Sequence, residues 1–262
     1  MTRLALELSL PAKSSFLGGS GGAAPAWSPA DLGSALRLWL KADVGITLNT
    51  GKVAAWADQS GNAIHFTQAT GANQPIYNAT GLNDLPTVDF VAASQTYVTS
   101  ADASPFNIGS AFSCFVVGQW HPENVTNSRM VSYSTTGGND YDNAASMAMI
   151  LRGAGSSEFR GYFFGSPTTP MAYTASTSQR YGVVVSGSSF TPYLNNAAGT
   201  ETTLVAAAAM GGGNGKLRQG ASVSSADYFD GYISEVVITN TALSSGDRLS
   251  LDNYFKAKWG LA

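Results

Sequence analysis

The sequence of 262 residues is poor in charge: Lys, Arg, Asp and Glu make up 12% of it, against roughly a quarter in an average globular protein. Coiled coils and long helices need these residues in bulk, so the composition excludes both classes. Hydrophobic residues at 44% exclude a disordered chain. With a formal net charge of −3, the chain lacks the excess of basic residues that a non-specific nucleic-acid binder needs, so we expect no nucleic-acid partner.

Cysteine and long apolar runs are also scarce. Cys114 is the only cysteine, which excludes an intrachain disulfide, and its apolar flanks predict a small buried strand residue rather than a reactive thiol. No stretch reaches the roughly 18 apolar residues of a membrane span, so we expect no membrane insertion. The start, MTRLALELSL, has one Arg and an apolar run broken by Glu7, which argues against a signal peptide.

The sequence is rich in glycine, serine, threonine and asparagine, and in short apolar segments. Residues 35–43 (ALRLWLKAD), 112–120 (FSCFVVGQW) and 231–239 (GYISEVVIT) are typical of strands, and clusters such as 211–215 (GGGNG) are typical of turns. Many short strands separated by such turns predict an all-β, two-sheet jelly-roll sandwich over residues 27–262.

Near the C-terminus the spacing of apolar residues changes from the alternation of strands to the three- and four-residue spacing of a helix. Ser244 lies three residues before Asp247, a weak form of the capping box, and Gly260 provides a stop signal. Between them the apolar residues recur at helical spacing: Leu251, Tyr254, Phe255 and Trp259. The sequence therefore predicts a C-terminal helix whose aromatic stripe packs on the sandwich rather than binding a ligand.

Residues 1–26 predict an N-terminal extended arm. Four leucines share one face of a strand, which Pro11 ends, and a Gly/Ser-rich linker (KSSFLGGSGGAAPA) follows: Leu4, Leu6, Leu8 and Leu10 form that face. The strand either returns to the sheet of its own domain or adds to a sheet edge of another subunit. We favour an assembly arm, because an isolated leucine face is costly to expose, and we expect a homo-oligomer.

Two segments at the ends of the domain resemble a known family. LRLWLKADVGITLNTGKVAAWADQSGNAIHFTQATGANQPIY (36–77), with PTVDF (86–90), is similar to the opening of a concanavalin A-like lectin/glucanase domain of the LamG type. YFDGYISEVVITNTALSSGDRLSLDNYFKAKWGL (228–261) resembles the closing strand and helix of such domains. The resemblance implies a concanavalin A-like jelly roll, and this fold hosts lectins, hydrolases and structural modules alike.

Similar domains occur in tailed-phage virion proteins, often behind a short N-terminal arm. The resemblance therefore implies a non-enzymatic decoration or fibre-type virion protein, made in the host cytoplasm and placed on the particle surface or tail. Its arm would bind other virion proteins, and its lectin-like domain would bind host-surface glycans. The alternatives are a free carbohydrate-binding lectin module and a glycan hydrolase.

Acidic residues give the hydrolase alternative little support. Hydrolases of this fold resemble one another in a Glu-x-Asp-x-x-Glu strand, on which residues two apart share a face and bring two carboxyls about 5 Å apart. No glutamate here has an acidic residue two positions on: Glu7, Glu123, Glu158, Glu201 and Glu235. Asp140 and Asp142 have the spacing but lie in a Gly/Asn loop. We therefore expect no catalytic residues and no enzyme.

One loop offers ligands for calcium, the only cofactor that the sequence suggests. In GGNDYDN the oxygen-bearing side chains that calcium prefers are Asn139, Asp140, Asp142 and Asn143. The alternative is an ordinary polar turn, since Asn and Asp tolerate unusual backbone angles.

Aromatic residues near the central loops are candidates for stacking on sugar rings. The four that flank these loops are Trp120, Tyr133, Tyr141 and Tyr162. The alternative for each is a place in the sandwich core or in an interface, where large aromatic side chains supply most packing area.

Overall fold

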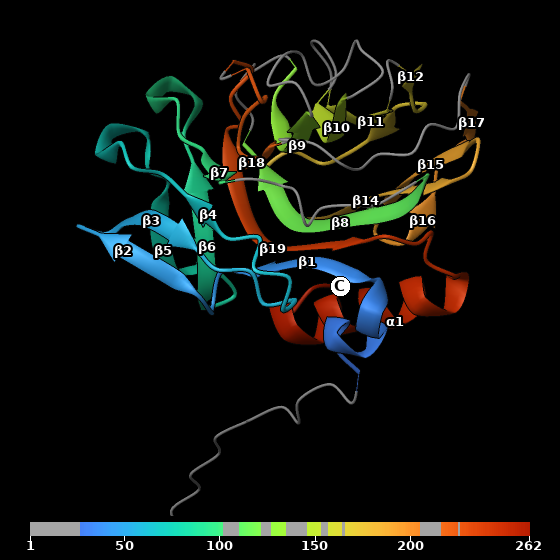
Figure 1. Cartoon of the computed structure of the whole chain (residues 1–262), viewed down its shortest axis with the longest axis horizontal. Helices are drawn as coiled ribbons and strands as arrows, with labels where there is room; N and C mark the ends of the chain where they lie inside the picture. The colour runs from blue at the N-terminus through green and yellow to red at the C-terminus, as the bar shows by residue number, and fades with distance from the viewer. Residues whose placement is uncertain are drawn as a thin grey trace, which may run out of the picture.

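The computed structural model describes residues 27–101, 110–121, 127–134, 146–152, 157–163, 166–204, 216–224 and 226–262, and for 146–152 it describes the backbone alone. Within these ranges the protein is a sandwich of two antiparallel sheets (Figure 1). The predicted arm, with Leu4, Leu6, Leu8 and Leu10, lies outside the described residues.

The back sheet is built around β19 (Gly231–Thr239). On one side β19 pairs with β8 (Ala111–Trp120), which leads to β14 (Gln179–Ser186) and β15 (Ser189–Leu194). On its other side β19 pairs with two strands in succession, which are β6 (Leu85–Phe90) and β1 (Leu36–Lys41). β5 (Ile76–Leu82) extends the sheet beyond β6, and β16 (Ala197–Ala198) and β17 (Thr202–Thr203) pair with β15.

The front sheet runs in the order β4 (Phe66–Thr67), β7 (Val98–Ser100), β18 (Lys216–Gln219), β9 (Arg129–Ser134), β10 (Ser146–Arg152), β11 (Glu158–Phe163). Two short strands, β12 (Ser166–Pro167) and β13 (Met171–Ala172), pair with β11. A hairpin of β2 (Ile46–Asn49) and β3 (Lys52–Trp56) connects the sheets at one edge, because β3 pairs with both β4 and β5.

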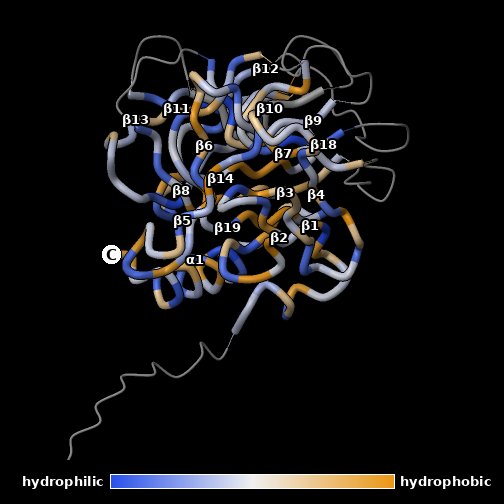
Figure 2. Tube along the Cα trace, turned by 90° about the vertical axis from the view of Figure 1, so that its left-hand side faces the viewer, coloured by the Kyte–Doolittle hydropathy of each residue, from blue (hydrophilic) through white to orange (hydrophobic). Residues whose placement is uncertain are grey.

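Aromatic side chains fill the space between the sheets. Phe112 of β8 meets Phe163 of β11 at 5.3 Å between ring centroids, and Phe159 of β11 meets Tyr181 of β14 at 5.2 Å. Figure 2 shows hydrophobic residues along β14 and β19 through the middle of the molecule. Cys114 is fully buried here, and burial raises the pKa of its thiol, so the prediction of a core cysteine is confirmed.

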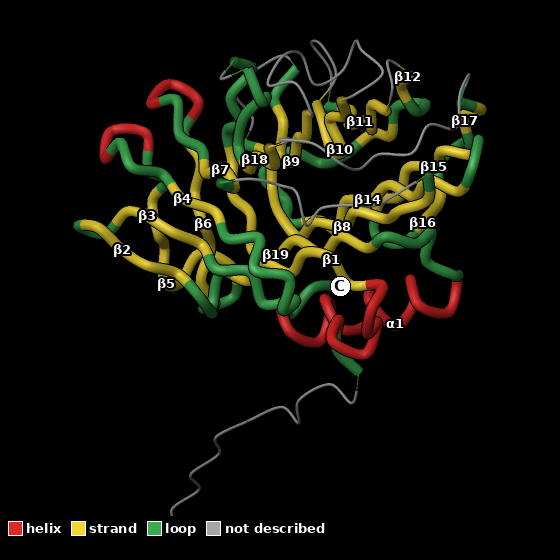
Figure 3. The backbone as a smooth tube through the Cα atoms, in the orientation of Figure 1, coloured by secondary structure: helices red, strands yellow, loops and turns green. Residues whose placement is uncertain are grey.

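Helix α1 (Ser245–Trp259) covers the outer face of the back sheet, and the short helix η1 (Pro29–Ala35) lies beside it (Figures 1 and 3). The Ser244 hydroxyl accepts a hydrogen bond from the backbone N–H of Asp247, and Gly260 ends the helix at a φ of 62°. The predicted stripe faces inward as expected: Leu251, Tyr254, Phe255 and Trp259 are all buried.

Because α1 covers one face of β19 and the front sheet covers the other, every residue of β19 is buried. Two further 3-10 turns, η2 (Gly71–Asn73) and η3 (Ala92–Ser94), lie in connections. The predictions of an all-β sandwich and of a C-terminal helix are thus confirmed. Within the described ranges no helix has the length and apolarity needed to span a membrane.

The close contact between β14 and β8 generates a stability prediction. A Cβ atom on Gly182 would lie 2.3 Å from the ring of Phe115, whose other side faces α1. We expect Gly182→Ala to lower the free energy of unfolding by about 1–3 kcal/mol through overpacking. Denaturant unfolding measures the change.

The matched control for this prediction is Gly246→Ala. A Cβ atom there meets nothing closer than 3.7 Å, and alanine favours the first turn of a helix. We expect this variant to be as stable as the parent or more so, and equal destabilisation by both variants would contradict the account of β14 packing.

Candidate functional site

The outer face of the front sheet carries a row of polar side chains. Arg218 of β18 pairs in register with Thr99 of β7 and with Ser132 of β9, and Ser132 and Tyr162 both pair with the same residue of β10. Residues directly opposite each other on neighbouring strands share a face of the sheet. Thr99, Arg218, Ser132 and Tyr162 therefore lie on one face of the front sheet, whose strands β9, β10 and β11 are at the top of Figure 1.

Two tyrosines extend this row beyond the edge of β7. The guanidinium carbon of Arg218 lies 4.3 Å from the ring centroid of Tyr97, and the Tyr97 ring lies 6.4 Å from that of Tyr228 at an angle of 34°. Both tyrosines are half-buried, whereas Arg218 is 7% exposed and donates from Nη1 to the carbonyl of Ser222 at 2.8 Å. We call Tyr97, Tyr228 and Arg218 the tyrosine platform.

Backbone contacts hold the platform in place. Tyr97 donates its N–H to the carbonyl of Asn73, and its own carbonyl accepts a hydrogen bond from Gln68 Nε2 at 3.2 Å. The next residue after Tyr228 is Phe229, which lies in the core 5.7 Å from Trp120, so the segment is anchored through that ring.

The electrostatics of the platform leave the phenol of Tyr228 neutral. Burial raises the pKa of Tyr228, the neighbouring Tyr97 raises it further, and Arg218 acts against both. A neutral phenol donates and accepts hydrogen bonds while its ring presents an apolar face. The platform therefore combines ring faces, hydroxyl groups and a guanidinium ion, a combination suited to a flat polyhydroxylated ligand.

Two of the four aromatic residues predicted for sugar stacking are corrected by the structure. Trp120 is 1% exposed, lies 4.7 Å from the ring of Tyr181 and donates from Nε1 to the hydroxyl of Ser128. Tyr133 is also 1% exposed and lies on the core side of β9. Neither ring has a face open to a ligand, because each packs between the two sheets.

The other predicted positions divide between the platform face and the undescribed segments. Tyr162 lies half-buried on the polar face, and Tyr141 lies outside the described residues. The calcium ligands Asn139, Asp140, Asp142 and Asn143 also lie outside them, so calcium stays a prediction. Within the described ranges no three His, Cys, Asp or Glu side chains gather as a metal site would require.

Sequence reasoning missed Tyr97 and Tyr228. A signal was present for Tyr97, since TYVTS at 96–100 alternates and places Tyr97 and Thr99 opposite the apolar Val98. For Tyr228 the adjacent Phe229 made the segment ambiguous, because two neighbouring aromatics leave open which one faces the core.

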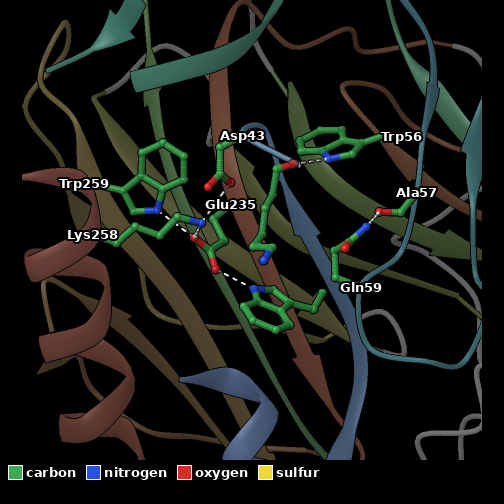
Figure 4. Close-up of polar contacts among 9 residues, drawn as sticks. Asp43, Trp56, Ala57, Gln59, Glu235, Lys258 and Trp259 are labelled. Atoms are coloured by element: carbon green, nitrogen blue, oxygen red, sulfur yellow. Dashed lines mark hydrogen bonds and ion pairs between the residues drawn. The ribbon is translucent and has the colours of Figure 1, made fainter. Parts of the chain in front are cut away.

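The buried carboxylate of Glu235 belongs to the scaffold. Its Oε1 accepts from Trp39 Nε1 at 2.5 Å, and its Oε2 accepts from Trp259 Nε1 at 2.7 Å and Lys258 Nζ at 3.0 Å (Figure 4). Lys258 also pairs with Asp43 at 3.0 Å. These donors come from β1 and α1, so the fully buried Glu235 joins the helix to the sheet and is covered from solvent.

A second polar row lies on the outer face of the back sheet. Tyr232, Gln119 and Ser178 hydrogen-bond to one another through their side chains. Beside them, burial raises the pKa of Asp89, opposed by hydrogen bonds from Thr87 and Asn78. These side chains bond mainly within the row, which is how a sheet satisfies half-buried polar groups.

Both histidines have polar partners. His65 accepts from the backbone N–H of Asp58 at 3.1 Å, and His121 lies 3.3 Å from Asp230. The pocket beneath α1 is lined by the Arg180–Asp252 ion pair among others, and its volume of about 10 Å³ leaves room for about one water molecule. It is therefore far too small for a small-molecule ligand.

Comparison with known proteins finds no matching family model and no matching curated protein. Solved structures do match. Domain 4 of AbnA, a GH43 extracellular arabinanase from Geobacillus stearothermophilus in complex with arabinotriose, has a TM-score of 0.56 and 12% identity, over 80% of this chain and 95% of that one.

Two larger proteins match over part of their length. A GH54 α-L-arabinofuranosidase has a TM-score of 0.55 at 15% identity, over 79% of this chain and 51% of its own. Trypanosoma rangeli sialidase has a TM-score of 0.56 at 11% identity, over 86% of this chain and 33% of its own. The chain thus spans a third to a half of these two proteins, and at such identities the likeness shows a shared β-sandwich fold.

These neighbours contradict the prediction that the chain is not an enzyme, because they are glycoside hydrolases or a domain of one. The prediction rested on the absence of two carboxyls spaced along a single strand. Carboxyl groups that different strands bring together leave no such spacing, and glycoside hydrolysis requires only that they flank the scissile bond. The fold is therefore one that occurs in these glycoside hydrolases, and the missing single-strand motif does not exclude catalysis.

The scaffold role of Glu235 is testable. Glu235→Gln places an amide among three donors and leaves Lys258 beside a neutral group, so we expect the free energy of unfolding to fall by about 3–5 kcal/mol. Asp43→Asn removes the more exposed partner of Lys258, and we expect it to cost less than about 1 kcal/mol. Chemical denaturation compares the two, and equal effects would contradict the role assigned to Glu235.

Proposed function

We propose that the protein is a glycan-binding domain that recognises its ligand on the outer face of the front sheet, at the tyrosine platform. The observation that carries the proposal is the arrangement of two half-buried tyrosine rings, 6.4 Å apart, with the Arg218 guanidinium over one of them. Apolar ring faces framed by polar groups are what a sugar requires, because its ring faces are apolar and its edges carry hydroxyls.

The fold neighbours support this proposal. The match that covers nearly all of its partner is a single domain of an arabinanase, solved with a trisaccharide. A domain of this architecture on its own therefore suffices to hold an oligosaccharide. The earlier resemblance to LamG-type lectin domains points to the same class of ligand.

We also propose, as a finer assignment, that the domain is displayed on a tailed-phage particle, on its surface or tail. Residues 1–26 would anchor it to other virion proteins, and host-surface glycans would be its ligands. Two sequence features support this assignment, namely the single leucine face of residues 4–10 and the Gly/Ser-rich linker after it. Display of several copies would raise the avidity of weak individual sites.

Glycan binding is tested with an array followed by calorimetry on the best glycan. We expect Tyr97→Ala and Tyr228→Ala each to weaken binding by about tenfold, or about 1.4 kcal/mol. Tyr97→Phe keeps the ring and loses less. Tyr77→Ala, at a half-buried tyrosine of β5, is the control and should bind as the parent does.

The same samples are assayed for newly released reducing ends, which separates binding from cleavage. An array without reproducible binding would refute the proposal. Binding that survives both tyrosine substitutions would place the ligand elsewhere on the molecule.

Anchoring is tested by deleting residues 1–26 in a phage that encodes the protein. We expect the truncated protein to fold, because Trp27 and the residues after it contain the sandwich and its helix, and to be missing from purified particles. Thermal unfolding checks the fold. Incorporation of the truncated protein at the normal level would show that the arm is not the anchor.

A further inference from the structure

We infer that β2 of one copy of the protein receives residues 4–10 of a second copy as an added strand, an inference that rests on the arm of the proposed function and names where it binds. Two observations carry it. The apolar core of the sandwich ends at β2 with a leucine left uncovered, and the arm has alternating leucines on one face of a predicted strand.

One edge of β2 is unpaired. Among the described residues β2 pairs with β3 alone, so its other edge presents backbone N–H and C=O groups that no described strand occupies. β2 lies at the outer left of Figure 1, apart from α1. It has the sequence ITLN, without the lysine or proline that commonly protects a free edge. An edge of this kind is a template for a strand from another chain.

The face of β2 that belongs to the core is apolar and incompletely covered. Ile46 pairs in register with Trp56 of β3, and Leu48 pairs with another residue of β3, Val53. Both β3 residues are fully buried in the core, so Ile46 and Leu48 share its face of the sheet. Ile46 packs against the core, whereas Leu48 is 47% exposed. The core therefore stops one strand short of covering Leu48.

Other strands at the sheet edges do not offer this combination. The outer edge of β1 is bonded to the segment after β3, since Gln59 donates its N–H to the carbonyl of Trp39 at 2.8 Å. Ile76 of β5 is exposed, but β3 pairs with the strand at that residue. The edges formed by β12, β13, β16 and β17 are strands of two residues. Among these edges, β2 alone combines a free edge with an exposed apolar side chain on the core face.

The sequence of the arm matches both faces of β2. Its leucines, at alternate positions from 4 to 10, would extend the core face beside Leu48. The other face of the arm carries Glu7. On the corresponding face of the hairpin, Asn49 pairs with Lys52, the one charged residue of β2 and β3. The leucines would thus bury a leucine, and opposite charges would lie on the same face.

The linker gives the arm enough length to cross to an adjacent molecule. The described part of the chain begins at Trp27, whose ring lies 6.4 Å from that of Tyr254 on α1, and residues 11–26 separate it from the leucines. A flexible chain of that length typically spans about 22 Å and reaches about 50 Å when extended. Each copy has one arm and one β2 edge, so two copies that exchange arms satisfy both with two-fold symmetry.

Self-association of the whole chain is measured by gel filtration with light scattering over a range of concentrations. We expect a concentration-dependent dimer. Leu48→Glu and Leu6→Glu should each raise its dissociation constant by about tenfold or more, because each places a charge where leucines are buried together. Leu249→Glu is the matched control, since Leu249 lies on α1 and is 51% exposed, and it should leave the dissociation constant unchanged. Thermal unfolding of each variant checks the fold.

Cysteine pairs locate the contact and identify the copy that supplies the arm. Cys114 is fully buried, so introduced cysteines react without interference from it. A Leu48→Cys chain is co-expressed with a differently tagged chain that carries one substitution in the arm: Leu4→Cys, Leu6→Cys, Leu8→Cys or Leu10→Cys. After mild oxidation we expect at least one combination to give a mixed disulfide. Leu249→Cys in place of Leu48→Cys should give none above background.

The outcomes separate this contact from the proposed role of the arm. A parent protein that stays monomeric would overturn the inference, as would equal weakening by Leu48→Glu and Leu249→Glu. The same cysteine pairs placed in one chain test the return of the arm to its own domain, and a disulfide found only within one chain would overturn the second copy as its source. A monomeric parent whose truncation at residues 1–26 still removes it from particles would leave the anchoring role intact, with another virion protein as the acceptor.

Discussion

The buried carboxylate of Glu235 is the contact on which the arrangement of layers depends. It lies on β19, the strand that pairs with β1, β6 and β8, and it accepts hydrogen bonds from Trp39 on β1 and from Trp259 and Lys258 on α1. Burial, and after it the Glu235 charge, raise the pKa of Tyr254 in the same helix. A buried charge requires such partners, so this site fixes where α1 docks.

Docking of α1 determines which surfaces are left for binding. The helix covers the outer face of the back sheet and lies away from the front sheet (Figure 1). On the outer face of the front sheet, Ser132, Ser134 and Arg218 are buried. The half-buried Tyr97 and Tyr228 of the tyrosine platform lie at the edge of that sheet. The core aromatics, Trp120 and Phe229 among them, support it from below. Scaffold and proposed binding face thus have separate sets of residues, as a stable domain with an adaptable site requires.

Much of the fold was predictable from local pattern. β1, β8, β14 and β19 have apolar runs or alternation long enough to identify, and α1 has both cap signals and an apolar stripe. Strands such as β5, with the sequence IYNATGL, were missed because an edge strand with few buried residues shows little apolar alternation. The prediction that the chain is not an enzyme was also wrong because it used a local pattern. The absence of two carboxyl groups on one strand says nothing about carboxyl groups that several strands bring together.

The binding face was harder to predict, because exposure of an aromatic ring depends on what packs over it. In β9 (RMVSYS) both faces of the strand are buried, although one of them carries serines. The alternation of apolar and polar residues therefore does not show whether the ring of Tyr133 is buried or exposed. The platform depends on residues 97, 218 and 228, which β7, β18 and the segment before β19 bring together over more than a hundred residues of sequence. Only the folded structure reveals that these three side chains meet.

A crystal structure of the protein with the tightest-binding oligosaccharide tests the central claim most directly. The account predicts a sugar ring against Tyr97 or Tyr228. A ligand bound on the back sheet or against α1, with the tyrosine platform empty, would contradict it.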